Sequence, residues 1–467
     1  MSGHTTSTTG VIAGEPPSAR RAPGPPASFI LGHLRDVERD PLGFFTRAQR
    51  EYGDIVGLRL LTQRACLLTH PDHVKHVLHD RHANYDKNTW DFRLLKPVLG
   101  DSLLTTDGPV WLRQRRLMQP AFHKRRIDAF ATIMVDQVAR LCERWTAHAK
   151  GGAVLDVAAE MNRLTLDIVT ESLFGTQVGN QAALVGESVR RLSESFVSDI
   201  GSPLGFLSIF LKRPLGRARR PAAALHAVVQ EIIERRLAAP DDDRDDLLAL
   251  LLAARDEETG ERMDPTLLRN QVLTLFVAGH ETTSNALAWT WYLLSTHPLV
   301  AERLRAELSQ VLGGRPPTID DLPRLGYTRM VVEEAMRLYP PAWATSRNPI
   351  EDDEIGGIRI PKGTLVFLSP YLTHRHPDFW ENPEGFDPER FRPERARERH
   401  RFAYFPFGGG PHLCIGETFA MTEATLVLAT VAQRFRLDLA PGERVEPAPL
   451  VTLRPRDGLP MHLHPLH

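Results

Sequence analysis

Cysteine is scarce in this sequence, with only Cys66, Cys142 and Cys414 among 467 residues. An odd and sparse set does not make a disulfide framework and is typical of a reducing compartment. The chain also lacks the run of about 20 apolar residues that a membrane-spanning helix needs. Its first 27 residues have no apolar core of the kind a secretory signal requires. We therefore predict a cytoplasmic protein without a membrane span.

An excess of charge of one sign is also absent. The 57 lysines and arginines nearly balance the 58 aspartates and glutamates, which leaves a formal net charge of -1. No global field therefore favours nucleic acid or an anionic membrane as a partner. Residues 1–27 are rich in Ser, Thr, Gly, Ala and Pro, and we predict that they form a disordered tail before one domain spanning residues 28–467.

Helical periodicity dominates for roughly 250 residues from position 71 onward. Two strands are predicted before it, at Ile55–Leu61 and Ala65–Thr69. The longest helix is predicted from Pro265 to Thr296, because Asp264 is a good N-cap and proline is favoured at the first helical position. Such a helix is on the order of 50 Å long and would cross a whole domain. The predicted fold class is mainly α with small β-sheets.

Cys414 lies in a glycine-rich loop that runs from Phe407 to Gly416. Backbone N–H groups in such a loop can stabilise a thiolate and set its strength as a metal ligand. The alternative from the loop alone is a buried, inert cysteine that follows a flexible turn.

Glu281 and Thr282 follow Gly279 in the middle of the long helix. Glycine there costs about 1 kcal/mol relative to alanine, which indicates a need for space or for a distorted helix. An acid beside a hydroxyl at a loosened turn offers a path for protons. A zinc HExxH motif is excluded because position 284 is serine. A structural role for the threonines, bonding back to their own helix, stays open.

The pattern Phe-x-x-Gly-x-His-x-Cys-x-Gly resembles the haem-binding loop of the cytochrome P-450 family. The acid–threonine pair, a Glu-x-x-Arg sequence at Glu334 and a Trp-x-x-x-Arg sequence at Trp111 occur in the family's order, so the resemblance covers nearly the whole chain. It implies a single large triangular α-rich fold. Haem b would lie between the long helix and the helix that follows the cysteine loop.

The resemblance also implies roles for individual residues. Glu281 and Thr282 would deliver the protons that oxygen activation needs. Glu334, Arg337 and Arg390 would form a buried network that locks the segment shaping the thiolate loop, and such a network is tolerable only when every member is paired. The residues implied to hold the haem are Trp111, Arg115, Arg347, Phe407, His412, Gly416 and, as the axial iron ligand, Cys414.

The walls of the substrate pocket can be assigned only by analogy with the family, and each candidate could equally be an ordinary core residue. The set is mostly apolar and has no cationic anchor, so we expect a hydrophobic substrate such as a fatty acid, terpene or steroid, which is hydroxylated or epoxidised. The candidates are Trp90, Phe92, Leu94, Phe196, Phe206, Leu275, Ala278, Ala342, Trp343, Ala344, Val451 and Thr452.

The predicted function is a haem-thiolate monooxygenase that uses O2 and acts as a monomer. Only about 50 residues follow Gly416, too few for a fused reductase, so electrons are expected from an external NAD(P)H-dependent chain. Ferredoxin or flavodoxin, with its reductase, would dock on a basic face formed by Arg113, Arg116 and Lys124–Arg126, unless that face is simply solvated. The alternatives are a peroxide-driven haem-thiolate peroxygenase and a non-catalytic haem or gas-binding protein.

Overall fold

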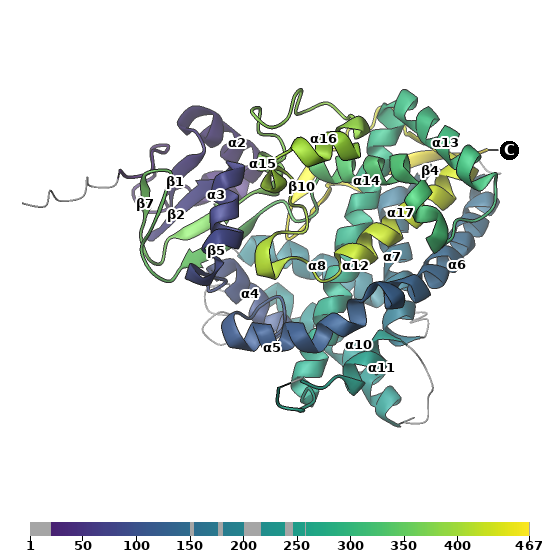
Figure 1. Ribbon diagram of the computed structural model, residues 1–467, viewed down its shortest axis with the longest axis horizontal. Coiled ribbons are helices and arrows are strands. Elements are labelled where there is room, and N and C mark those ends of the chain that lie inside the picture. The colour runs from purple at the N-terminus through teal and green to yellow at the C-terminus, as the bar shows by residue number, and fades with distance from the viewer. Residues whose placement is uncertain are drawn as a thin grey trace, which may run out of the picture.

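The computed structural model describes residues 20–149, 154–175, 181–199, 216–238, 246–256 and 258–466. Most of the body is helical, and the largest sheet lies at one side of it with α2 and α3 (Figure 1). The predicted fold class is confirmed. The α-helices are α1 Leu34–Arg39, α2 Pro41–Tyr52, α3 Pro71–Lys75, α4 Trp90–Leu99, α5 Gly108–Met118, α6 Lys124–Ala149, α7 Val157–Phe174, α8 Gln181–Asp199, α10 Arg219–Ala238, α11 Leu247–Ala253, α12 Pro265–Thr296, α13 Pro298–Leu312, α14 Gly326–Leu338, α15 Pro370–Thr373, α16 Pro393–Glu398 and α17 Glu417–Arg434.

The strands form small sheets. The largest has the order β1-β2-β8-β5-β3, in which β1 and β2 are antiparallel and β2 and β8 are parallel. Another sheet has the order β4-β12-β9, and β6-β7 and β10-β11 are two-stranded. The strands are β1 Ile55–Leu60, β2 Gln63–Leu68, β3 Tyr85–Asp86, β4 Val154–Asp156, β5 Thr345–Pro349, β6 Asp353–Ile355, β7 Ile358–Ile360, β8 Leu365–Leu368, β9 Phe435–Leu439, β10 Pro447–Pro449, β11 Leu453–Pro455 and β12 Pro460–Pro465.

Helix α12 is the axis of the helical body. It begins and ends where the sequence predicted, and the Asp264 side chain accepts hydrogen bonds from the N–H groups of Thr266 and Leu267. It packs against α7, α10, α14 and α17, and most of its side chains are buried. A helix that is apolar nearly all round is stable only when its neighbours cover it. Helix α12 therefore gives the site a rigid wall.

Residues 20–27 contact the folded body, although the sequence assigned them to a disordered tail. The Arg20 carbonyl oxygen accepts a hydrogen bond from the N–H of Arg359 (3.1 Å), and that of Pro23 accepts one from Gly57 (2.6 Å). These bonds use free positions on the edge strands β7 and β1. Ordered sequence therefore begins before the predicted boundary at residue 28.

In the part of the chain that the structure describes, no helix combines the length and the apolar character needed to cross a membrane.

Candidate active site

Tight turns shape the loop before α17. The N–H of Cys414 donates to the Phe407 carbonyl oxygen (3.0 Å), which folds the loop back on itself. Gly408 and Gly410 have φ angles of +76° and +65°, in the left-handed region that glycine adopts without strain. The sequence therefore needs glycine here to turn the cysteine side chain toward the interior.

The Cys414 sulfur is accessible from an internal cavity and lies beside the N-terminus of α17. Loss of solvent raises the pKa of its thiol, whereas the N–H groups of Gly416 and Glu417 and the positive charge of Arg115 act in the opposite direction. N–H groups aimed at a sulfur are what a thiolate ligand requires. The loop thus presents a single soft ligand to the cavity.

Replacement of Gly410 by alanine is expected to displace this loop. A Cβ at position 410 would lie 1.8 Å from the Leu78 carbonyl oxygen, which is backbone and cannot rotate away. We expect the purified variant to carry much less haem per protein than the wild type. Gly313→Ala is the matched control, because Gly313 also has a positive φ but open space around it. It should cost about 1 kcal/mol of unfolding free energy and leave the haem-to-protein ratio unchanged. A fully haem-loaded Gly410→Ala protein would contradict this reading.

The predicted Glu-Arg-Arg network is present and buried. Glu334 on α14 receives Arg337 Nε at 2.7 Å and Arg337 Nη2 at 2.8 Å. Arg390 Nε lies 3.3 Å from the same carboxylate, and the N–H of Asp387 donates to it at 2.9 Å. Each charge in the network therefore has a partner, as burial demands.

Arg337 also ties α14 to the segment that precedes the cysteine loop. Its Nη1 donates to the carbonyl oxygens of His374 (2.9 Å) and Pro383 (2.6 Å), and its Nη2 donates to Gly385 (2.8 Å). The His374 ring then accepts the N–H of Phe405 (2.9 Å), two residues before Phe407. The network is therefore linked through one histidine to the start of the cysteine loop.

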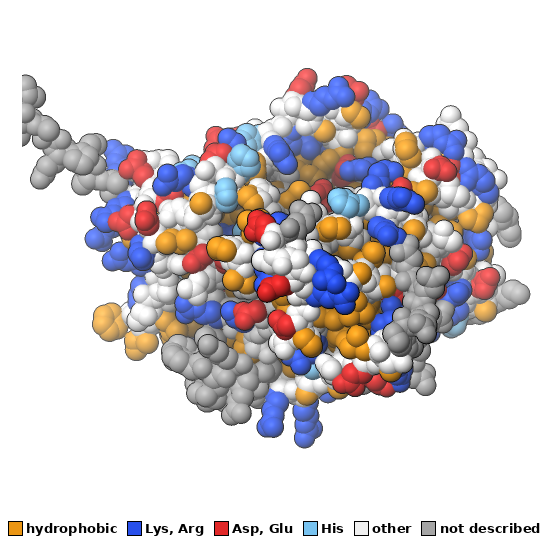
Figure 2. Space-filling view, turned by 60° about the horizontal axis from the view of Figure 1, so that its bottom comes forward, with side chains coloured by type: hydrophobic (Ala, Val, Ile, Leu, Met, Phe, Trp, Pro, Cys, Tyr) orange, Lys and Arg blue, Asp and Glu red, His pale blue; other side chains and the backbone are white. Residues whose placement is uncertain are grey.

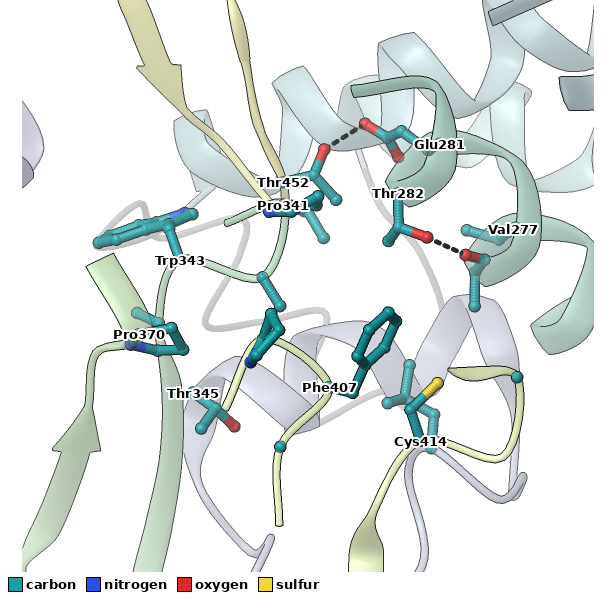
Figure 3. Close-up of a pocket in the computed structure, with 18 of the residues that line it drawn as sticks. Val277, Glu281, Thr282, Pro341, Trp343, Thr345, Pro370, Phe407, Cys414 and Thr452 are labelled. Carbon is teal, nitrogen blue, oxygen red and sulfur yellow. Dashed lines mark hydrogen bonds between the residues drawn. The ribbon is translucent and has the colours of Figure 1, made fainter. Parts of the chain in front are cut away.

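Thr282 and Cys414 lie on opposite sides of the cavity (Figure 3). Thr282 comes from the middle of α12, and its hydroxyl donates to the Ala278 carbonyl oxygen at 2.6 Å. Thr283 makes the same kind of bond to Gly279 (3.2 Å), so both threonines bond back to their helix, as the structural alternative anticipated. Thr282 still lines the cavity, and a hydroxyl that donates once keeps lone pairs with which to accept.

Gly279 is explained by packing between helices. A Cβ at this position would lie 3.1 Å from a methyl group of Val169 on α7. The need for space that the sequence indicated is therefore a close approach of α7 to α12, just before the acid–threonine pair.

The Glu281 carboxyl group points away from Cys414 and toward the loop between β10 and β11 (Figure 3). The hydroxyl of Thr452 donates to it at 2.8 Å, and Ser193 on α8 lies 3.2 Å from both of its oxygens. Burial raises the pKa of Glu281. The sequence placed acid and threonine together, but only the threonine faces the thiol.

The predicted haem-holding residues meet at one end of the cavity. The rings of Trp111 and His412 have centroids 4.0 Å apart, and Arg115 Nη1 donates to the Leu413 carbonyl oxygen at 2.9 Å. Arg347 enters from β5 and is buried. All four side chains line the same cavity as Cys414.

Lys87 belongs to this cluster, and sequence reasoning missed it. Its side chain is 6% exposed, lines the cavity, and donates to the carbonyl oxygens of Leu103 (3.3 Å) and Thr106 (3.1 Å). Burial and the neighbouring charge of Arg347 lower the pKa of Lys87 to about 7. No local motif distinguishes this lysine, because its neighbours in space come from distant parts of the chain.

The cluster fits the propionates of a haem. Burial and the charges of Lys87 and Arg347 lower the pKa of His412 to about 2, so its ring is neutral, and its buried Nδ1 has no hydrogen-bond partner among the described residues. Buried cations and an unused ring nitrogen beside a cavity favour a bound anion. A thiol able to bind iron and an anion cradle in the same cavity therefore fit a haem with thiolate ligation.

The cavity has a volume of about 960 Å³ and a mostly apolar wall. Leu94 was predicted to line it but does not; it is buried elsewhere on α4. The Phe196 side chain and Phe206 lie outside the described residues. The predicted pocket residues that line the cavity are Trp90, Phe92, Leu275, Ala278, Ala342, Trp343, Ala344, Val451 and Thr452.

The basic face predicted around α5 is partly neutralised within the chain. Arg113 pairs with Glu261 at 2.7 Å, and Arg116 pairs with Glu258 and lies 3.6 Å from Asp256. Over much of the face shown in Figure 2, acidic and basic side chains stand next to one another. The cations of α5 are therefore less available to an acidic partner than the sequence implied.

Comparisons with known proteins agree with this site. The family model described as cytochrome P-450 matches residues 22–458. The chain is 40% identical to cyclooctatin synthase of Streptomyces melanosporofaciens over 91% of both chains. It is 37% identical to cyclooctat-9-en-7-ol 5-monooxygenase of the same organism over 88% of both chains. It is 35% identical to pentalenene oxygenase of Streptomyces avermitilis, over 93% of this chain and 95% of that protein.

The chain therefore belongs to the cytochrome P-450 family. It is an oxidoreductase of the monooxygenase class that uses haem and oxidises a hydrophobic small molecule.

Proposed function

We propose that this enzyme hydroxylates or epoxidises a terpenoid, and that the Cys414 thiolate would hold the iron of haem b. The observation that supports this proposal most strongly is the apolar wall of the cavity, to which Trp90, Phe92 and Trp343 contribute. Of the charged residues that line the cavity, Arg39, Asp40 and Arg456 are exposed and lie at the rim, whereas the buried Lys87 and Arg347 belong to the anion-binding cluster. A large apolar pocket with few polar groups suits a hydrocarbon skeleton. The relatives named above carry names of terpenoid oxidation, which supports the same class.

In the proposed mechanism, haem held by the Cys414 thiolate would supply the activation of dioxygen. The protein's own residues would hold the cofactor and handle protons. Lys87, Arg115, Arg347 and His412 would neutralise or donate to the propionates, with Trp111 packed against the His412 ring. Glu281 would supply protons. Thr282 would accept a hydrogen bond within the cavity through its free lone pairs.

The electrons would come from NAD(P)H through a separate reductase and a ferredoxin or flavodoxin. Arg113 and Arg116 are paired within the chain, so we propose that an acidic carrier docks nearer Arg125, which is exposed at the start of α6. We also propose that the protein acts as a monomer in the cytoplasm.

A panel of hydrophobic ligands tests the proposed substrate class. We expect sesquiterpene and diterpene hydrocarbons and alcohols to shift the Soret absorbance at micromolar concentration, because they exchange apolar surface for the apolar wall. Charged, hydrophilic compounds of similar size should give no shift. Turnover should require a ferredoxin and its reductase. Binding only by charged compounds would contradict the substrate class, and turnover with hydrogen peroxide alone would favour the peroxygenase alternative.

A further inference from the structure

Two elements, the β10–β11 loop and α8, hold the Glu281 carboxyl group, and neither of them holds it with a cation. Thr452, in the loop between β10 and β11, donates to Oε1 at 2.8 Å, and Ser193 on α8 lies 3.2 Å from each oxygen. Glu281 itself is on α12 and is 6% exposed. Both partners are hydroxyl groups, which can donate to a carboxylate and can accept from a carboxylic acid.

Asn285, one turn along α12, fixes the direction of the Thr452 hydroxyl. Its Nδ2 donates to Thr452 Oγ1 at 3.0 Å. Because that bond occupies a lone pair of the hydroxyl oxygen, the hydroxyl proton is directed to Glu281 Oε1. A proton on the carboxyl group then resides on Oε2, where Ser193 can accept it. The hydrogen bonds therefore run in one direction, from Asn285 to Thr452 and from Thr452 to Glu281.

The charged groups around this acid do not form an ion pair with it. Arg454 on β11 faces it, and its charge lowers the pKa of Glu281, but its guanidinium donates to Glu194 on α8 at 2.9 Å. Glu194 is bound in turn by Arg190 at 2.7 Å. A carboxylate locked to a buried arginine could accept a proton only by breaking that pair. Glu281 has no such pair to break.

Thr452 is also part of the cavity wall, next to Val451. The same side chain thus touches the space proposed for substrate and the acid proposed to supply protons. The loop between β10 and β11 therefore connects the substrate space to Glu281. The two residues in contact, Thr452 and Glu281, are 171 positions apart, so no local motif reveals the contact.

We propose that Thr452, directed by Asn285, is a positioning residue that holds Glu281 as a proton donor able to lose and regain its proton, so that the β10–β11 loop belongs to the proton path. This proposal rests on the proposed function of Glu281. The hydroxyl supports the charged form by donating to it, and removal of this bond favours the protonated form.

The test uses the haem-loaded enzyme and the carbonyl stretch of protonated Glu281, identified by infrared difference spectroscopy as the band lost in Glu281→Gln. In Thr452→Val the midpoint of this band is expected to move up by about one pH unit, because a donor to a carboxylate has been removed. The ratio of hydrogen peroxide released to product formed should rise about 10-fold, a part of what an acid catalyst contributes. Thr452→Ser should restore both values.

Thr290→Val is the matched control, because the Thr290 hydroxyl is also buried, on α12, but donates only to the Ala286 carbonyl oxygen (2.7 Å). It should leave the midpoint unchanged. Ser193→Ala should move the midpoint in the same direction as Thr452→Val, which keeps the test valid if the valine variant folds poorly. An unchanged midpoint in both variants would overturn the proposal, as would an equal shift in Thr290→Val. A wild-type ratio of hydrogen peroxide to product in Glu281→Gln would instead overturn the proton role of Glu281 in the proposed function. In that case the shift of the infrared midpoint in Thr452→Val would still show whether Thr452 positions Glu281.

Discussion

Replacement of Glu334 by glutamine is expected to give a protein that does not retain haem, rather than a slower enzyme. The change leaves Arg337 and Arg390 buried with their shared carboxylate gone. Breaking a buried ion pair costs about 3–5 kcal/mol, a large part of the stability of a typical domain. Arg337 also holds the segment that leads through His374 to the cysteine loop. The haem-to-protein ratio and the urea midpoint of unfolding measure the effect.

Glu333→Gln is the matched control for this substitution. Glu333 is the adjacent residue on α14 and pairs with Arg329 at 3.0 Å, but the arginine is largely exposed. Arg329 can stay in water without its partner, so loss of this pair should cost about 1 kcal/mol or less and the variant should load haem normally. A Glu334→Gln protein with full haem content and a low turnover number would show that the network acts on the chemistry and not on the loop.

Replacement of Cys414 by alanine is expected to abolish monooxygenase turnover. No other thiol of the described residues lines the cavity, since Cys66 and Cys142 are buried away from it. Loss of a partner that merely orients a ligand costs about 10–100-fold, so loss of the ligand itself should exceed about 100-fold. Product formation with a ferredoxin and reductase, normalised to bound haem, is the measurement. Cys142→Ala should keep wild-type activity per haem. Equal activity in both variants would remove Cys414 from the mechanism.

The fold features that the sequence predicted best are those with a local cause. Asp264 and Pro265 mark the start of α12 by capping and by a preset φ angle, and both act within one turn. The network of Glu334, Arg337 and Arg390 was predicted by resemblance to the family, and the geometry agrees with it. Such features depend on neighbours in sequence or on a pattern that many chains share.

Helix phase explains the directions in which Glu281 and Leu94 point. Adjacent residues on a helix point about 100° apart, so Glu281 and Thr282 cannot both face the same point in the cavity. Leu94 is two residues after Phe92 on α4 and therefore points to the opposite side, into the core. On a helix, a side chain of suitable type that is one or two positions away points in another direction and does not line the cavity in the same way.

The contacts that sequence reasoning missed join residues that are far apart in the sequence. Lys87 meets Arg347 across some 260 positions of sequence, and Thr452 meets Glu281 across 171. The pairing of Arg113 and Arg116 with acids beyond α11 is equally non-local. A composition or motif can identify a lysine or a threonine, but the neighbours that change its pKa or direct its hydroxyl are set by packing.

The reduced carbon monoxide difference spectrum of the haem-loaded wild-type protein tests the account most directly, because its Soret position reports which kind of protein atom binds the iron. With the Cys414 thiolate as ligand, we expect the Soret band at the red-shifted position characteristic of thiolate ligation. A band only at the shorter wavelength of a histidine-ligated or thiol-ligated haem would contradict the assignment of Cys414 and the oxygen activation that depends on it.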